Sequence, residues 1–361
     1  MAAMLYFCTR KVNLKLDSVT TRGRFSKKIL VLFPGALGDF ICFLPALEAL
    51  AGQAEVDLLA RTEYAALVPE RVTTGSLERY EIRRLFAADA EHDERLKRFF
   101  ASYASVYSWM GSAQPEFAGR LRTLCLGRLL LYPFRPPDAA VPVVDYFLGC
   151  LGIARPKEIS LHIPLQAEAW AWSEALWLQR DLRGKKVLVI APGSGAREKN
   201  WPFDFYMEVM SWWNERFAGE SVVVMGPVEE ERGPTGAPRE GIHLLRDMDL
   251  AQLAALLRRC DLYLGNDSGV SHLASALGVK TVALFGPTDP RRWAPWGRTT
   301  TVITQKVKCS PCSAQQVKSC AHRKCLTTLR PTHVIHKLED LLPERGNCAT
   351  LLDNERCRDY S

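Results

Sequence analysis

The decisive stretch of this sequence is Leu262-Tyr263-Leu264-Gly265-Asn266-Asp267-Ser268-Gly269-Val270-Ser271-His272-Leu273-Ala274. An apolar run at 262–264 and an amphipathic run at 270–277 predict a strand, a tight turn and a helix start. Ser268 suits the N-cap of that helix, and Gly269 lets the backbone approach a ligand closely. The free amides that follow, with the positive end of the helix dipole, favour a phosphate or diphosphate. The alternative is an ordinary capped helix that binds nothing.

Strand and helix patterns alternate on both sides of this turn, which is typical of parallel sheets covered by helices. Strands are expected at 29–33, 56–60, 186–191, 221–225, 261–264, 281–285 and 300–304, and helices at 40–50, 93–100, 168–182, 203–217, 250–259, 270–277 and 332–342. The proline-rich segment 132–142 interrupts the first half, so its number of strands stays open. The last helix either closes the second half or crosses back to the first.

The length of 361 residues predicts two domains. The expected division is a basic leader at 1–27, a first Rossmann-like domain at 28–165, a second at 166–345 and a tail at 346–361. The predicted fold class is α/β. Its two doubly wound sheets turn their carboxyl ends toward a shared central cleft, where ligands bind in such folds.

The composition, with 47% hydrophobic and 24% charged residues, is that of a soluble globular protein. The apolar runs are far shorter than the roughly 20 residues of a membrane-spanning helix, and the leader lacks the apolar core of a secretory signal. We therefore expect a cytoplasmic protein. The net charge of +7 suits an anionic substrate or peripheral contact with an anionic membrane, although solubility explains it equally well. Nucleic-acid binding is disfavoured, because no basic run is interleaved with aromatic residues.

Three glycine-bearing turns follow expected strands. They are Pro34-Gly35-Ala36-Leu37-Gly38-Asp39, Pro192-Gly193-Ser194-Gly195 and the turn at Ser268. None has the glycine pattern of dinucleotide-binding proteins or the lysine loop of P-loop ATPases. No cofactor is therefore expected, and any phosphate must be bound in another way.

Three polar residues near these turns have two alternative roles each. Asp39 begins a helix whose dipole keeps a carboxylate ionised and able to accept a proton, or it is a simple cap. Lys199 reaches a diphosphate from a loop that Trp201-Pro202 holds fixed, or it is a solvated lysine. His272 donates to a phosphate or packs in the core. These residues alone leave the alternatives open.

Four of the eleven cysteines form a pattern. Cys309, Cys312, Cys320 and Cys325 are spaced Cys-x2-Cys-x7-Cys-x4-Cys, which could hold a tetrahedral zinc. The spacing departs from the usual pair of Cys-x2-Cys knuckles. A reduced or disulfide-linked loop without metal is the alternative that this departure favours.

Together, these segments resemble glycosyltransferase family 9, the heptosyltransferases of the inner core of bacterial lipopolysaccharide. The matching pieces run in order over about 28–342: the turn at 35–39 with Pro45, the turn at 192–194 with Lys199 and Trp201-Pro202, 267–272, and Phe285-Gly286-Pro287-Thr288-Asp289-Pro290. The resemblance implies a GT-B fold and an inverting transfer without metal. It also implies a nucleotide-diphosphate sugar as donor, of the ADP-heptose type, and a lipid-linked or polysaccharide acceptor at the cytoplasmic face of the inner membrane.

The resemblance further implies a role for each matching residue. Asp39 would deprotonate the acceptor hydroxyl. Lys199 and the backbone amides of Ser268, Gly269 and Val270 would hold the departing diphosphate. The other donor-site residues implied are Ser194 and His272 beside the diphosphate, Asp267 in the same turn, Glu229 (with Glu230 close by) at the ribose, and Met248 at the base.

Some features leave the function open. The segment 107–112 and the region after it do not match the acceptor-binding stretch of the lipopolysaccharide enzymes, and the four-cysteine loop resembles an element of only part of the family. One alternative is a nucleotide-sugar epimerase of the same fold class, which would need further acid and base residues around the sugar. Another is a catalytically silent nucleotide-sugar-binding protein, in which Asp39 or Lys199 would be expected to be lost.

Overall fold

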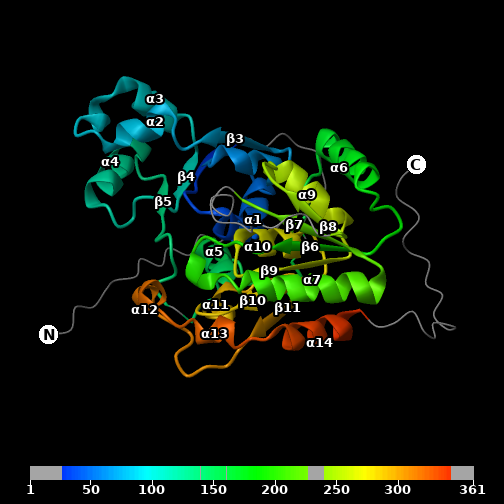
Figure 1. The fold of residues 1–361 in the computed structure, drawn as a ribbon. Coiled ribbons are helices and arrows are strands. Elements are labelled where there is room, and N and C mark those ends of the chain that lie inside the picture. Colours follow the sequence, from blue (N-terminus) through cyan, green and yellow to red (C-terminus); the bar gives the residue numbers. More distant parts are fainter. Residues whose placement is uncertain (1–26, 139, 160, 227–239, 343–361) are drawn as a thin grey trace.

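The computed structural model describes residues 27–342, apart from 139, 160 and 227–239. The expected tail, and all but the last residue of the expected leader, lie outside the described residues. Two parallel sheets covered by helices lie side by side (Figure 1), as the alternating pattern predicts. Within the described part, no helix combines the length and the apolar character needed to cross a membrane.

The first sheet has five parallel strands in the order β3-β2-β1-β4-β5. Its central strand, β1, is buried from Ile29 to Leu32. Three of its strands, β3, β4 and β5, were not predicted. The elements of this half are β1 (Lys28–Leu32), α1 (Leu37–Ala51), β2 (Glu55–Ala60), β3 (Val72–Ser76), α2 (Tyr80–Arg83), α3 (Glu94–Ala101), β4 (Ser105–Ser108), α4 (Pro115–Cys125), β5 (Leu129–Leu131) and α5 (Val143–Cys150).

The second sheet has six parallel strands in the order β11-β10-β9-β6-β7-β8. Its elements are α6 (Ala167–Gln179), β6 (Val187–Ala191), α7 (Phe203–Phe217), β7 (Glu220–Val224), β8 (Ile242–Leu245), α9 (Leu250–Arg259), β9 (Leu262–Asn266), α10 (Gly269–Ala276), β10 (Thr281–Phe285), α11 (Pro290–Trp293), β11 (Thr300–Thr304), α12 (Ala314–Ser319), α13 (Lys324–Thr327) and α14 (Pro331–Leu341). The strands β6, β9 and β10 are buried at every residue, which explains their continuous apolar character. The last helix, α14, packs on α7 and so closes this half.

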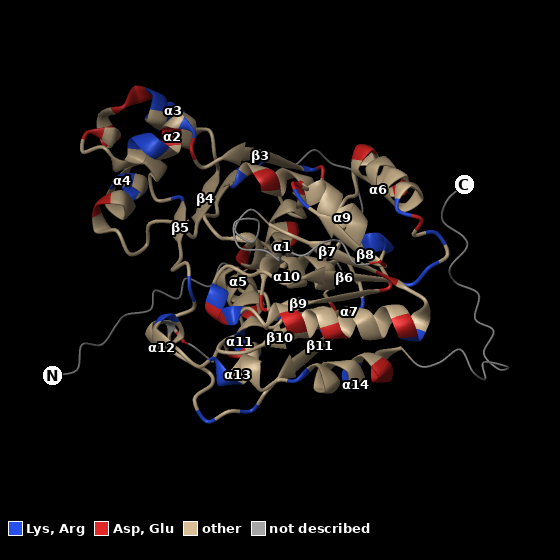
Figure 2. Ribbon diagram, in the orientation of Figure 1, with Lys and Arg blue, Asp and Glu red and all other residues tan. Residues whose placement is uncertain are grey.

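Helices α2, α3 and α4 form a lobe that projects beyond the first sheet (Figure 1). The apolar faces of α3 and α4 meet around Phe100 and Phe117. Basic and acidic residues both occur along the helices of the lobe (Figure 2), and ion pairs join Arg84 to Asp89 and Arg95 to Glu81. The mixed charges therefore cancel locally.

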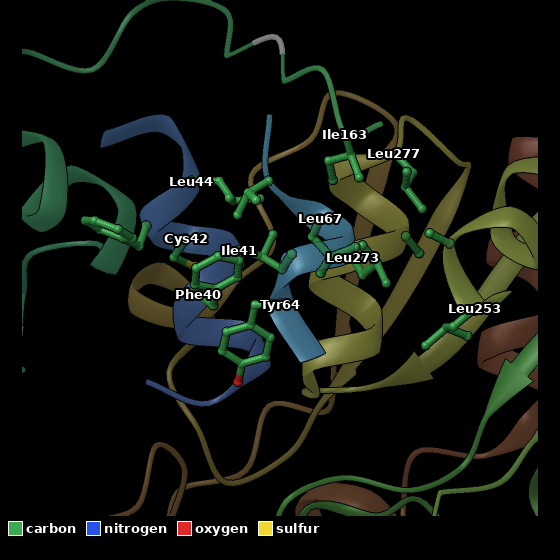
Figure 3. Packing of buried hydrophobic residues seen from close by; sticks show 14 of the residues in the cluster. Phe40, Ile41, Cys42, Leu44, Tyr64, Leu67, Ile163, Leu253, Leu273 and Leu277 are labelled. Carbon is green, nitrogen blue, oxygen red and sulfur yellow. The ribbon is translucent and has the colours of Figure 1, made fainter. Parts of the chain in front are cut away.

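The two halves are joined through α1 and α10. Ile41, Cys42 and Leu44 of α1 belong to the same buried apolar cluster as Leu273 and Leu277 of α10, and the two helices pack together (Figure 3). Because separating the helices would expose apolar side chains to water, this interface favours close packing of their N-terminal ends. Each of those ends follows the carboxyl end of a central strand, β1 or β9.

Candidate active site

Asp39 lies in the first turn of α1, just beyond the carboxyl end of β1. The residue is 7% exposed, and Ala36 provides no side-chain cap. The carboxylate is therefore the negative group at the positive end of this helix. Arg135 Nη1 donates to Asp39 Oδ1, and Arg135 Nη2 donates to Oδ2 at 3.0 Å. The sequence predicted the position of Asp39 but gave no indication of this cation.

The turn between β9 and α10 caps its helix as predicted. Ser268 is the N-cap, and its hydroxyl accepts from the backbone N–H of Ser271 at 3.4 Å. The hydroxyl of Ser271 donates to the carbonyl of Asn266 at 2.5 Å, which fixes the turn against its strand. The first amides of a helix have no acceptor inside it, and Gly269 and Val270 contribute two of them. The turn thus has the arrangement of an anion-binding helix N-terminus.

Lys199 lies beside this turn. Its Nζ donates to Asp267 Oδ2 at 2.7 Å, and Thr288 Oγ1 donates to the same oxygen at 2.7 Å. The loop that carries Lys199 is fixed, because Trp201 is 2% exposed and its Nε1 donates to the carbonyl of Leu329 at 2.8 Å. The ammonium group is therefore held at the turn and does not extend freely into solvent.

Asn266 connects the Lys199 loop to the turn, a role that we did not predict. Its Oδ1 accepts from the backbone N–H of Trp201 at 2.9 Å and from the hydroxyl of Tyr206 at 3.0 Å. Its Nδ2 donates to the carbonyl of Pro192 at 2.6 Å. The sequence did offer one sign of this role: Asn266 is a polar residue at the end of an expected buried strand. In the structure it is fully buried, and buried amides are normally hydrogen-bonded.

The remaining donor-site candidates are placed as follows. Ser194 Oγ donates to Asn200 Oδ1 at 2.6 Å, so its hydroxyl closes the loop that carries Lys199. Met248 follows β8 and packs, partly buried, against the main apolar cluster. Glu229 and Glu230 lie outside the described residues.

The N-termini of α1 and α10 contact each other at Gly38 and Gly269. A Cβ added to Gly269 would lie 2.8 Å from Leu37 Cβ and 3.0 Å from the backbone nitrogen of Gly38. On the opposite side of the contact, a Cβ on Gly38 would lie 3.2 Å from His272 Cδ2. Side chains are thus excluded at this point, which brings the helix that carries Asp39 directly against the start of α10.

His272 is buried at this contact. It is 4% exposed, and its Nδ1 lies 3.5 Å from Cys42 Sγ of α1. Burial lowers the pKa of His272, although the nearby carboxylates of Asp267 and Asp39 act in the opposite direction. The ring packs between α1 and α10, at the start of the helix that follows Ser268.

A cavity of about 590 Å³ opens at the carboxyl edge of the first sheet. It is lined by Pro34 after β1, Ala60 at the end of β2, Ser76 at the end of β3 and Met110 after β4, with Arg61 and Arg83 among its charged groups. This is the edge at which ligands bind in doubly wound sheets. The cavity and Asp39 thus belong to the same end of the first domain.

Comparisons with known proteins agree with these motifs. Residues 156–322 match the model of glycosyltransferase family 9 (heptosyltransferase). Lipopolysaccharide heptosyltransferase 1 of Pseudomonas aeruginosa is 32% identical over 174 residues, which are 48% of this chain and 46% of that protein. The chain spans about half the length of the first curated relatives that it matches. Lipopolysaccharide heptosyltransferase 2 of Escherichia coli is 26% identical over 353 residues, 87% of this chain and 98% of the relative.

A solved structure of the glycosyl transferase family 9 from Veillonella parvula superposes with a TM-score of 0.71 at 20% identity, over 87% of this chain and 97% of that one. This chain is similar to the heptosyltransferases of glycosyltransferase family 9. Its fold is GT-B, because both Rossmann-like halves take part in the structural match.

The cysteine loop of this family 9-like protein contains free thiols. Cys309 is exposed, Cys312 and Cys320 are half-buried, and Cys325 is buried. Within the described residues, no group of three or more His, Cys, Asp or Glu side chains is arranged to hold a metal ion.

Proposed function

We propose that this family 9-like protein is an inverting, metal-independent glycosyltransferase. It moves a heptose from an ADP-heptose-type donor to a lipopolysaccharide core or related glycan acceptor. The heptosyltransferase relatives support the reaction class, and the match to one of them extends over 87% of this chain. We further propose that it acts in the cytoplasm, at the inner face of the membrane that holds a lipid-linked acceptor.

The observation that carries the proposal is the contact between the N-termini of α1 and α10. It packs the start of the helix that carries Asp39 against the start of the helix that follows Ser268, although 229 positions separate these two residues in the sequence. A base and an anion-binding turn at one cleft are what direct displacement of a diphosphate by a hydroxyl requires. An epimerase would need further acid and base groups around the sugar, and both Asp39 and Lys199, which a silent binding protein could lose, are present.

In this reaction Asp39 accepts the proton of the acceptor hydroxyl, whose oxygen attacks the anomeric carbon from the face opposite the diphosphate. The bond between that carbon and the diphosphate oxygen breaks, so the configuration inverts. Lys199 and the amides of Gly269 and Val270 stabilise the negative charge that develops on the leaving group. The ammonium group is already at the turn, 2.7 Å from Asp267, so it needs only to exchange partners.

The test is a transfer assay with purified protein, ADP-heptose and a heptose-deficient lipopolysaccharide acceptor. We expect a product one heptose heavier by mass spectrometry, inverted anomeric configuration by NMR, and activity that persists in EDTA. Transfer with retained configuration, or activity lost in EDTA and restored by a divalent cation, would contradict the mechanism. Thermal-shift measurements across a set of nucleotide-diphosphate sugars test the donor independently, since a ligand of the native state raises Tm.

A further inference from the structure

Arg135 covers both oxygens of Asp39. It lies in the loop that follows β5, and its two terminal nitrogens each donate to a different carboxylate oxygen. Asp39 is 7% exposed, whereas the side chain of Arg135 is 43% exposed. The guanidinium group thus lies between the carboxylate and solvent.

Aromatic rings from both domains hold this guanidinium in place. Its central carbon lies 4.4 Å from the ring centroid of Phe134, its neighbour in the loop, and 4.9 Å from that of Trp293. Trp293 is the last residue of α11, in the second domain. Stacking on two rings stabilises the cation in this position.

This arrangement is incompatible with proton transfer to Asp39. A general base needs an oxygen within about 2.6–3.2 Å of the hydroxyl that it deprotonates. Arginine is permanently charged and holds carboxylates through two parallel hydrogen bonds, so the pair does not open by losing a proton. The guanidinium must move before the acceptor hydroxyl reaches the carboxylate.

We propose that Arg135 is a positioning residue that keeps Asp39 covered until the acceptor enters the cleft. The inference rests on the proposed role of Asp39 as the base. When the acceptor arrives, its own oxygen groups take over the guanidinium, and one oxygen of Asp39 becomes free. Before that, the covered carboxylate cannot deprotonate a water molecule. Arg135 thereby suppresses a side reaction in which water attacks the anomeric carbon, the diphosphate departs and the proton of the water passes to Asp39.

The first test measures release of nucleotide diphosphate from the donor without acceptor. In Arg135→Gln we expect this hydrolysis to rise about tenfold or more, within the range that a positioned base provides. Arg135→Lys, which keeps the charge but not the two parallel hydrogen bonds, should lie between Arg135→Gln and wild type. The double variant Arg135→Gln/Asp39→Asn should return to the wild-type background. A matched control is Arg84→Gln, which breaks a bidentate ion pair with Asp89 in the projecting lobe. This variant should leave hydrolysis of the donor unchanged.

A second readout is independent of activity. Carbodiimide coupling of an amine to Asp39, measured by peptide mass spectrometry without donor, should increase in Arg135→Gln and stay unchanged in Arg84→Gln. Unchanged coupling in Arg135→Gln would show that Arg135 does not cover Asp39 and would overturn the inference, even with normal transfer. Increased coupling without Asp39-dependent hydrolysis, in a protein that still transfers heptose, would overturn it too. Absence of transfer by the wild type is instead failure of the proposed function.

Discussion

Replacing Gly269 with alanine tests whether the contact between α1 and α10 sets the distance between base and donor turn. The added Cβ would lie 2.8 Å from Leu37 Cβ, whereas carbon atoms pack at about 3.5–4.0 Å. Its other near neighbour is the backbone nitrogen of Gly38, at 3.0 Å, which cannot rotate away. The two helices must therefore separate by about 1 Å. Gly269 does not have a positive φ, so the effect comes from this contact and not from backbone strain.

Separating the two helices should lower both the stability of the protein and the rate of transfer. Overpacking of this kind costs about 1–3 kcal/mol of unfolding free energy. A misplacement of about 1 Å between reacting groups lowers the rate about 100-fold. We expect the loss mainly in kcat, because the hydrogen bonds that fix the donor turn, such as that between Ser271 and Asn266, remain possible.

The assay compares kcat, donor Kd and Tm across three variants. Gly38→Ala should have a milder effect than Gly269→Ala, since its nearest neighbour, the edge of His272, is 3.2 Å away. Gly119→Ala in α4, where an added Cβ meets nothing within 4 Å, is the control and should alter neither rate nor affinity. Full kcat in Gly269→Ala would refute the idea that this contact sets the catalytic distance.

Three further predictions concern the charged and titrating groups of the site. Asp39→Asn should lower kcat about 10²–10⁴-fold and leave donor Kd nearly unchanged in calorimetry, because the base acts only on the acceptor; normal turnover would remove Asp39 from the mechanism. Lys199→Ala should lower kcat/KM for the donor about 10–100-fold, the value of a charged hydrogen bond. The control is Lys185→Ala: Lys185 lies just before β6 and forms a 2.8 Å ion pair with Glu220, and its loss should leave donor kinetics unchanged. Equal losses of kcat/KM in the two variants would contradict a special role for Lys199. Because burial holds the pKa of His272 below its ordinary value of 6.5, the unfolded state binds the proton first, so unfolding free energy should fall as pH decreases from about 7 toward 5. Chemical denaturation should show a smaller fall in unfolding free energy for His272→Gln than for the wild type. An equal fall in both proteins would show that His272 does not contribute to this pH dependence.

The second domain was largely predictable because its signals are local. Helices α7 and α9 and strands β10 and β11 begin and end at the predicted residues. Each of these strands is a short run of apolar or β-branched residues, and α9 begins at a capping box formed by Asp249 and Gln252. Where burial or capping determines an element, its own residues are sufficient to identify it.

The first domain was less predictable: β3, β4 and β5 were all missed, and two of them depend on their neighbours. β3 has the sequence Val-Thr-Thr-Gly-Ser, and β5 consists of three leucines that are only half-buried. Neither run alternates or extends far enough to indicate a strand. Each is a strand because it pairs with a longer neighbour, β2 or β4, at the edge of the sheet.

In the candidate site, too, features set by neighbouring residues were predictable, and features set by distant contacts were not. The turn at Ser268, the fixed loop around Lys199 and the position of Asp39 at a helix start were predicted from residues adjacent in sequence. Arg135 was not, because it reaches Asp39 across 96 positions from a proline-rich loop without regular structure. Thr288 was quoted as part of a motif, but its bond to Asp267 depends on the packing of β9 beside β10.

The contacts of the two cations suggest how substrates act on this protein. Arg135 is bound to Asp39 and Lys199 to Asp267, so each carboxylate of the site already holds a cation. Because the domains share a buried apolar cluster at α1 and α10, separating them would expose that cluster to water and is costly. Exchange of ionic partners requires only side-chain rotation. We therefore expect Lys199 to exchange Asp267 for a bound diphosphate, and Arg135 to exchange Asp39 for a bound acceptor. The backbone at the Gly38–Gly269 contact should stay nearly stationary. A substrate-induced rotation of one domain that opens this contact would contradict the account.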